Sequence, residues 1–133
     1  MNANTIQKYK KKTIPQLIKI ATTHFNKFIR VRDKEFLCVS CNGGVEQAGH
    51  FYSGGHYSAL RFNPNNVHGQ CKRCNLFLSG NLNEYRRNII SRIGEEGLIE
   101  LDNLADYYKK NNFKWDRFSL IKIIEEYKKL NKL

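Results

Sequence analysis

The sequence predicts an α+β fold in which a small two-stranded unit, tied together by cysteines, is embedded in several α-helices. Two observations predict this fold. Apolar residues follow a helical spacing over residues 13–33 and again after residue 82, whereas residues 34–81 lack that spacing and are interrupted by glycine and asparagine. The four cysteines form two Cys-x-x-Cys pairs, and both pairs fall inside this irregular segment.

The chain has 133 residues, which suffices for one domain with a modest core. We therefore expect a single domain over residues 1–133. Its first part, residues 1–12, ends in a run of lysines and is expected to form a basic, flexible arm. A helix over 13–33, a cysteine-bound finger over 34–81 and a helical part over 82–133 are expected to follow.

The helix expected over 13–33 has clear signals at its start. Thr13 provides an N-cap, Pro15 lies in the first turn, and Gln16 occupies the capping-box position. An apolar stripe with i, i+3, i+4, i+7 spacing follows and predicts the buried face. The stripe consists of Leu17, Ile20, Ala21, His24, Phe25 and Phe28.

Within the finger, two strands are expected around 45–52 and 59–62, joined by a glycine-rich loop. A short helix is expected to begin near Cys71 and to end at about Leu78, where a Ser-Gly-Asn sequence interrupts it. The remaining helices are expected at about 82–93, 98–110 and 116–131.

The charge of the chain is strongly positive, with 23 Lys and Arg against 12 Asp and Glu and a net charge of +11. Such a field attracts polyanions, so DNA is the expected partner. No apolar run approaches the ~18 residues of a membrane span, and the N-terminus is polar. The expectation is a cytoplasmic protein with no membrane partner.

The spacing of the cysteines predicts a metal site. Two Cys-x-x-Cys knuckles supply the four thiolates of a tetrahedral zinc shell, and a reducing cytosol disfavours disulfides. Four thiolates fill that shell and leave no position for substrate, so the zinc is expected to be structural. The predicted ligands are Cys38, Cys41, Cys71 and Cys74.

Between and beside the cysteines lies an ordered string of polar residues: His50 in an expected strand, Asn66 before the second knuckle, and Asn75 directly after it. This order resembles that of the HNH (His-Me finger) nucleases, with asparagine in place of their final histidine. The resemblance implies a zinc-stapled ββα-metal finger. In it His50 would be the general base, Asn66 would orient the base or its loop, and Asn75 would bind a divalent metal. Taken singly, each asparagine also suits a turn or a cap.

These residue types fit phosphodiester hydrolysis. A neutral imidazole such as that of His50 is a suitable base near pH 7. Mg²⁺ or Mn²⁺ would neutralise charge on the phosphoryl group, and the amide oxygen of Asn75 is a reasonable ligand for such a hard cation. Arg61 is expected to contact a phosphate oxygen.

A narrower resemblance covers about residues 5–94. The stretches TIPQLIKIATTHFNKFIRVRDKEFLCVSC and NVHGQCKRCNLFLSGN look like those of the NinG/Rap recombination proteins of lambdoid phages and prophages. This resemblance implies a metal-dependent endonuclease acting on branched recombination intermediates, such as Holliday junctions or D-loops, in the cytoplasm of a bacterial or phage-infected host cell. Paired incisions on opposed strands would favour a homodimer.

The sequence departs from the HNH pattern at Gly49, where many members carry a metal ligand. The second protein ligand of the catalytic metal is therefore open. His68 is preferred, His56 and Glu46 are alternatives, and His50 itself is a ligand if another histidine is the base.

Basic side chains near the finger are expected to contact the DNA backbone, which provides affinity without reading sequence. A non-catalytic, zinc-stapled DNA-binding module is the alternative function, because it would share the charge and the cysteines. The expected DNA contacts are Arg61, Lys72, Arg73, Arg86 and Arg87.

Overall fold

The computed structural model describes all residues, 1–133, and is of the mixed α+β kind, with helices and one small sheet. The chain forms two compact units: Met1–Phe28 together with Lys114–Leu133, and Ile29–Phe113. The single domain expected over 1–133 stays a prediction, because a compact unit need not fold on its own. No helix combines the length and apolarity needed to cross a bilayer.

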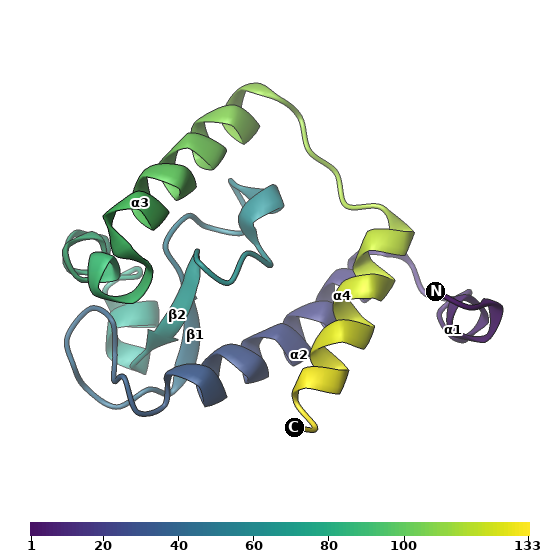
Figure 1. Ribbon diagram of the computed structural model, residues 1–133, viewed down its shortest axis with the longest axis horizontal. Coiled ribbons are helices and arrows are strands. Elements are labelled where there is room, and N and C mark those ends of the chain that lie inside the picture. Colours follow the sequence, from purple (N-terminus) through teal and green to yellow (C-terminus); the bar gives the residue numbers. More distant parts are fainter. The chain divides into compact units, whose positions relative to one another are not determined.

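The first unit begins with helix α1, Ala3–Lys8, in the segment expected to be a flexible arm (Figure 1). The helix forms because the side chain of Asn2 accepts a hydrogen bond from the backbone N–H of Thr5 at 2.9 Å. Tyr9, which follows the helix, is buried and donates its hydroxyl to Glu125 at 2.8 Å. The end of this segment is therefore tied to the rest of the unit at Tyr9, whereas α1 buries none of its residues.

Helix α2, Ile14–Asp33, starts with the predicted capping box. The N–H of Thr13 donates to the side chain of Gln16 at 2.9 Å, and the N–H of Gln16 donates back to the hydroxyl of Thr13 at 3.3 Å. The predicted apolar stripe is confirmed in its centre, because Leu17, Ala21 and Phe25 are fully buried.

Helix α4, Arg117–Leu130, completes the core of the first unit. The ring of Tyr127 meets those of Phe25 and Phe28 edge-on, with centroids 4.9 and 5.1 Å apart. Asp116 caps the helix by accepting from the N–H of Ser119 at 2.8 Å.

The second unit contains a two-stranded antiparallel sheet formed by β1, Gln47–His50, and β2, Val67–Gln70 (Figure 1). The first strand was predicted, but the second strand predicted at 59–62 is wrong. That segment carries a short 3₁₀-helix, Ser58–Leu60, inside a loop that connects the strands. The loop is fixed by side-chain hydrogen bonds that a strand pattern does not reveal.

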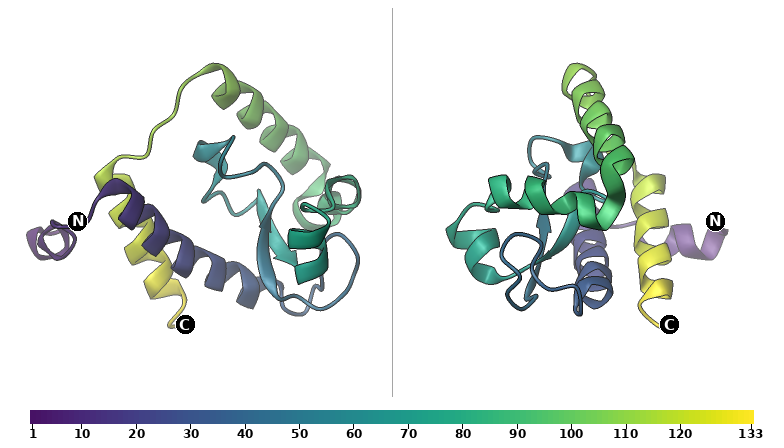
Figure 2. Two further views of the ribbon diagram at one scale, coloured as in Figure 1. Left: turned by 180° about the vertical axis from the view of Figure 1, so that it is seen from behind. Right: turned by 60° about the vertical axis from the view of Figure 1, so that its left-hand side comes forward.

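Helical segments follow the sheet. A π-helix, Arg73–Phe77, lies in the segment predicted as a short helix, and α3, Leu82–Lys110, comes after a turn with left-handed backbone at Asn81. Gly94 breaks the helical geometry of α3 with φ 78° and ψ 166°. The two straight parts of α3, visible in Figure 2, correspond to the two helices predicted there.

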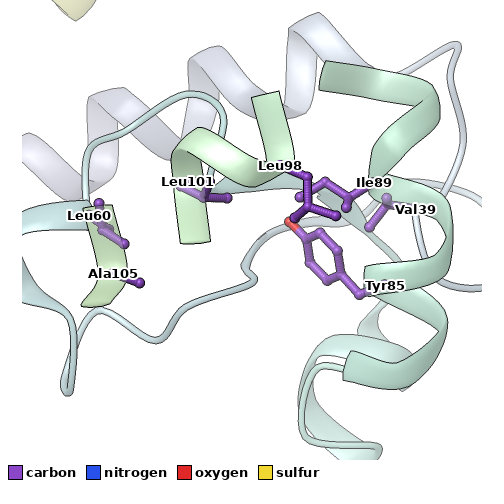
Figure 3. Close-up of a cluster of buried hydrophobic side chains, with 7 residues drawn as sticks. All are labelled: Val39, Leu60, Tyr85, Ile89, Leu98, Leu101 and Ala105. Carbon is purple, nitrogen blue, oxygen red and sulfur yellow. The ribbon is translucent and has the colours of Figure 1, made fainter. Parts of the chain in front are cut away.

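A cluster of apolar side chains packs the kinked helix α3 onto the finger. Tyr85 and Ile89, from the part of α3 before the kink, meet Leu98 from the part after it, and Val39 joins them from the first cysteine knuckle (Figure 3). All four are buried. Burial on this scale stabilises by roughly 1.5–3 kcal/mol for each large side chain. The knuckle and the helix are therefore parts of one core.

Candidate functional site

Four cysteine sulfurs form the clearest site in the second unit. Cys38, Cys41, Cys71 and Cys74 are free thiols, and their Sγ atoms all lie within 4.8 Å of one another. The Sγ atoms of Cys41 and Cys71 are 3.6 Å apart. A tetrahedral zinc shell with Zn–S bonds of about 2.3 Å places its sulfurs about 3.8 Å apart. The cluster therefore fits a metal ion such as zinc.

Backbone and side-chain donors surround this cluster. The N–H of Gly43 lies 3.4 Å from the Sγ of Cys41, and the N–H of Cys74 lies 3.4 Å from the Sγ of Cys71. The side-chain amide of Asn81 donates to the Sγ of Cys74 at 3.5 Å. These donors lower the pKa of the thiols that they contact and so favour the thiolate form that binds zinc, whereas burial opposes them and raises the pKa of Cys74 to about 12.

His50 lies at the end of β1, and its ring is fixed by the loop that connects the strands. Its Nε2 is 2.9 Å from the backbone carbonyl oxygen of Arg61. A carbonyl oxygen only accepts, so Nε2 carries the hydrogen and Nδ1 of the neutral ring has the free lone pair. Burial lowers the pKa of His50 below its ordinary value of 6.5, which keeps the ring neutral at pH 7.

A cavity of about 430 Å³ opens beside His50. Its lining includes Ser79 and Asn83, from the turn before α3 and its first turn, and the exposed Arg86 one turn further on. Arg86 is positioned by Asp102, to which it donates two hydrogen bonds of 3.1 and 2.6 Å. A polyanion that enters this cavity would meet the imidazole and the guanidinium together.

Asn66 is fully buried and braces the loop that positions His50. Its Oδ1 accepts from the N–H of Tyr52 at 2.8 Å, and its Nδ2 donates to the carbonyls of Tyr52 and Leu60 at 2.9 and 3.1 Å. The loop leaves β1 after His50 and passes through Tyr52 and Leu60, next to Arg61. Asn66 therefore supports the loop segment whose carbonyl contacts His50, and its role in orienting the base stays a prediction.

Asn75 lies in the π-helix, directly after Cys74. Its Nδ2 donates to the side-chain oxygen of Gln47 on β1 at 2.7 Å. The amide nitrogen is thereby engaged, and the oxygen Oδ1 remains as the atom that suits a hard cation.

The strand register separates the two buried histidines. His50 pairs with Val67, and His68 pairs with Gly49. Because side chains alternate across a strand, His50 and His68 lie on opposite faces of the sheet. The Nδ1 of His68 donates to the hydroxyl of Tyr85 at 3.1 Å, because that hydroxyl gives its own hydrogen to the carbonyl of Gly49. The structure therefore does not bring together the two histidines considered as ligands of one ion.

The other candidate ligands lie at the surface. His56 is exposed in the loop, where its Nδ1 is 3.0 Å from the hydroxyl of Ser53. Glu46 is exposed and accepts from the backbone N–H of Lys72 at 3.0 Å. Neither belongs to a group of three or more ligand side chains, because the cysteine cluster is the only such group.

Sequence reasoning missed Gln70, a buried glutamine on β2. Its Nε2 donates to the hydroxyl of Ser40 at 2.8 Å and to the carbonyl of Gly80 at 2.7 Å, whereas its Oε1 is buried without a hydrogen-bond partner. A Cβ on Gly49 would lie 1.8 Å from that oxygen. The side-chain oxygen of Gln70, on the neighbouring strand, therefore fills the space that a side chain at residue 49 would occupy.

The predicted DNA contacts differ in their surroundings. Lys72 and Arg73 are exposed on the π-helix segment, and Arg87 pairs with Glu84 at 3.1 Å on the surface of α3. The Nε of Arg61, in contrast, is buried and has no partner. The exposed ion pair of Arg87 and Glu84 contributes little to stability, so Arg87 can exchange this contact for one with a phosphate.

Comparison with known proteins places the chain in a family. The family model described as "Bacteriophage Lambda NinG protein" matches residues 2–133. Protein ninG of Escherichia phage lambda is 43% identical over 89 residues, which are 65% of this chain and 44% of the relative. Protein ninG of Salmonella phage P22 is 35% identical over 108 residues, which are 79% of this chain and 52% of the relative.

The chain thus spans about half the length of the curated relatives that it matches. No solved structure matches it. The family model covers nearly the whole chain, including the cysteine cluster, His50 and the kinked helix α3. The chain belongs to the NinG family.

Proposed function

We propose that this protein is a metal-dependent DNA endonuclease of the HNH (His-Me finger) kind, which hydrolyses phosphodiester bonds in branched recombination intermediates. One observation supports this most directly: the contact between Nε2 of His50 and the carbonyl oxygen of Arg61. It leaves Nδ1 as the basic atom of a neutral ring.

In this proposal His50 removes a proton from the attacking water, and Asn66 holds the loop that orients His50. Arg86, which lines the same cavity, contacts a phosphate oxygen once DNA is bound. The cysteine cluster binds zinc and fixes the knuckles to the strands, away from the reaction itself.

The chemistry of the polar side chains near β1 fits a hard divalent cation. Asn75 offers Oδ1, because its Nδ2 is engaged with Gln47. Amide oxygens are ligands that Mg²⁺ and Mn²⁺ accept. Such an ion, when bound, would neutralise charge on the phosphoryl group. His68 is less suited, since it lies on the face of the sheet opposite to His50.

The preference for branched DNA is proposed from the resemblance to recombination proteins alone, because the net charge of +11 supports only binding to a polyanion. Resolution requires incisions on two strands, which favours a homodimer.

The test is a gel assay on a labelled four-way junction and on a matched linear duplex, with Mg²⁺ or Mn²⁺ added or omitted. We expect metal-dependent cutting of the junction by the wild type and loss of cutting in His50→Ala, with DNA affinity unchanged. His56→Ala is the matched control, because His56 is an exposed loop histidine outside the cavity. Binding of the junction without cutting under every metal would favour the non-catalytic DNA-binding module instead.

A further inference from the structure

A second cavity, of about 440 Å³, lies in the second unit and shares no lining residue with the cavity beside His50. Two arginines line it, Arg32 from the end of α2 and Arg92 from α3, together with the polar side chains of Asn65, His68 and Ser91. The proposed nuclease mechanism uses none of these five residues.

Arg32 is fixed in place by hydrogen bonds. Its guanidinium donates to both carboxylate oxygens of Asp33 at 2.7 and 2.9 Å, and to the backbone carbonyls of Pro64 and Val67 at 3.0 and 2.7 Å. Burial opposes ionisation of Asp33, but hydrogen bonds from Arg32 and from the N–H of Gly69 outweigh it and lower the pKa of the carboxyl. This ion pair is a rigid wall of the cavity.

Arg92 is fixed on one side only. Its Nη2 donates to the backbone carbonyls of Phe36 and Leu37 at 2.8 and 3.0 Å, and its guanidinium lies 5.4 Å from the centroid of the Phe36 ring. Its Nη1 is buried and has no hydrogen-bond partner in the protein. Leaving such a charged donor without an acceptor is costly, so the position favours an acceptor from outside the chain.

The charge of the cavity is positive. Its one acidic residue is Asp33, which is only 2% exposed and is neutralised by Arg32. Nothing in the lining neutralises Arg92. His68, which is also only 2% exposed, stays uncharged, because burial and the nearby charges of Arg32 and Arg92 hold its pKa at about 4.

We propose that this cavity binds a phosphate group. A tetrahedral oxyanion supplies the acceptors that Nη1 of Arg92 lacks, and the side-chain amide of Asn65 and the hydroxyl of Ser91 add neutral donors at the same cavity. The phosphate belongs either to a DNA backbone or to a free phosphate compound, which share this chemistry. The inference does not depend on nuclease activity, since it concerns binding alone.

The experiment uses the zinc-loaded chain without added Mg²⁺ or Mn²⁺. One arm follows thermal unfolding in increasing inorganic phosphate. The other measures the affinity for a short linear duplex by fluorescence anisotropy at several salt concentrations. The variants are Arg92→Met, which removes the unpartnered donor, and Asn65→Asp, which adds a negative charge to the lining without removing a hydrogen bond that the fold uses. Asn103→Asp, exposed on α3 outside both cavities, is the control for the charge change.

If a backbone phosphate is the ligand, Arg92→Met weakens duplex binding about tenfold and makes the slope of log K against log salt shallower by about 1. Asn65→Asp weakens binding more than Asn103→Asp does. If free phosphate alone is the ligand, phosphate raises the melting temperature of the wild type and of Asn103→Asp but not that of Arg92→Met or Asn65→Asp. In that case Asn65→Asp binds the duplex with the same affinity as Asn103→Asp.

The proposal fails if phosphate leaves the melting temperature unchanged and Asn65→Asp binds the duplex as Asn103→Asp does. Because Asn65→Asp leaves the fixed arginines in place, this result is independent of any folding defect in Arg92→Met. Cleavage by the wild type is measured separately. If the protein does not cut DNA, the phosphate and duplex-binding results still decide whether this cavity binds phosphate.

Discussion

The Nε2 atom of His50 lies 2.9 Å from the backbone carbonyl oxygen of Arg61, eleven residues further along the chain. This contact decides the tautomer of the ring, because the carbonyl accepts a hydrogen from Nε2. It also links the candidate base to the loop that Asn66 braces. The site is therefore built from the sheet and from a loop whose shape depends on buried hydrogen bonds.

The acid limb of the pH profile tests the role of His50. Burial lowers its pKa below 6.5, and the contact with the Arg61 carbonyl only partly opposes this. A base must be neutral, so cutting is expected to fall as pH decreases through the pKa of His50, with a midpoint below 6.5. Cleavage rates measured between pH 4.5 and 8 at DNA concentrations well below saturation check this, because they report the pKa of the DNA-free protein. A midpoint above 6.5 would contradict the assignment of His50 as the base.

Substitution of Asn66 is expected to destabilise the finger. Asn66→Ala removes three hydrogen bonds and leaves buried backbone groups of Tyr52 and Leu60 without partners, at a cost of about 2–4 kcal/mol. Asn66→Asp should cost more despite its equal size, because a carboxylate oxygen would face two carbonyl oxygens. Urea unfolding followed by circular dichroism measures both. Asn63→Ala, in the same loop, is the comparison, and equal loss in all three variants would contradict the bracing role.

The sequence predicts those parts of the fold that depend on local pattern. The capping box of Thr13 and Gln16 and the break within α3 follow from residue type and spacing. The cysteine cluster also follows, since two Cys-x-x-Cys knuckles have few other uses. These features need no knowledge of which distant segments meet.

The features that the sequence did not predict depend on contacts between segments that are distant along the chain. The second strand lies at Val67–Gln70 because that segment pairs with β1, although residues 59–62 have the more strand-like composition. The same pairing places His50 and His68 on opposite faces, which no spacing along the chain reveals. The hydrogen bonds of Arg86 and of Tyr52 to Asp102 likewise join residues that are remote in sequence.

Removal of the metal from the cysteine cluster should unfold the second unit. Binding of structural zinc is worth about 10–16 kcal/mol in small zinc domains, which exceeds the stability of a domain of this size. Cys41→Ser removes the most exposed ligand and is expected to abolish stoichiometric zinc binding and to lower the melting temperature sharply. Zinc content by mass spectrometry and thermal unfolding measure the two effects. A chelated wild type that keeps its melting temperature would show that the cluster is not a structural metal site.

A side chain at residue 49 is expected to be incompatible with the present position of Gln70. In Gly49→Ala the new Cβ would lie 1.8 Å from Oε1 and 2.6 Å from Cδ of Gln70, whose amide is fixed by Ser40 and Gly80. We expect a loss of about 1–3 kcal/mol in the free energy of unfolding. Gly44→Ala is the control, because a Cβ there meets no atom within 4 Å.

A double-mutant cycle shows whether Gly49→Ala is destabilising because of the clash with Gln70 or because β1 does not accept any side chain at residue 49. In Gln70→Ala the obstructing amide is gone, so adding Gly49→Ala should cost much less than it does in the wild type. Urea unfolding of the four proteins gives the coupling energy, expected at about 1–2 kcal/mol in favour of the double variant. Additive losses would mean that Gly49 is required for its backbone alone. A coupling energy of that size would instead mean that the Gln70 amide occupies the space that a side chain at residue 49 needs.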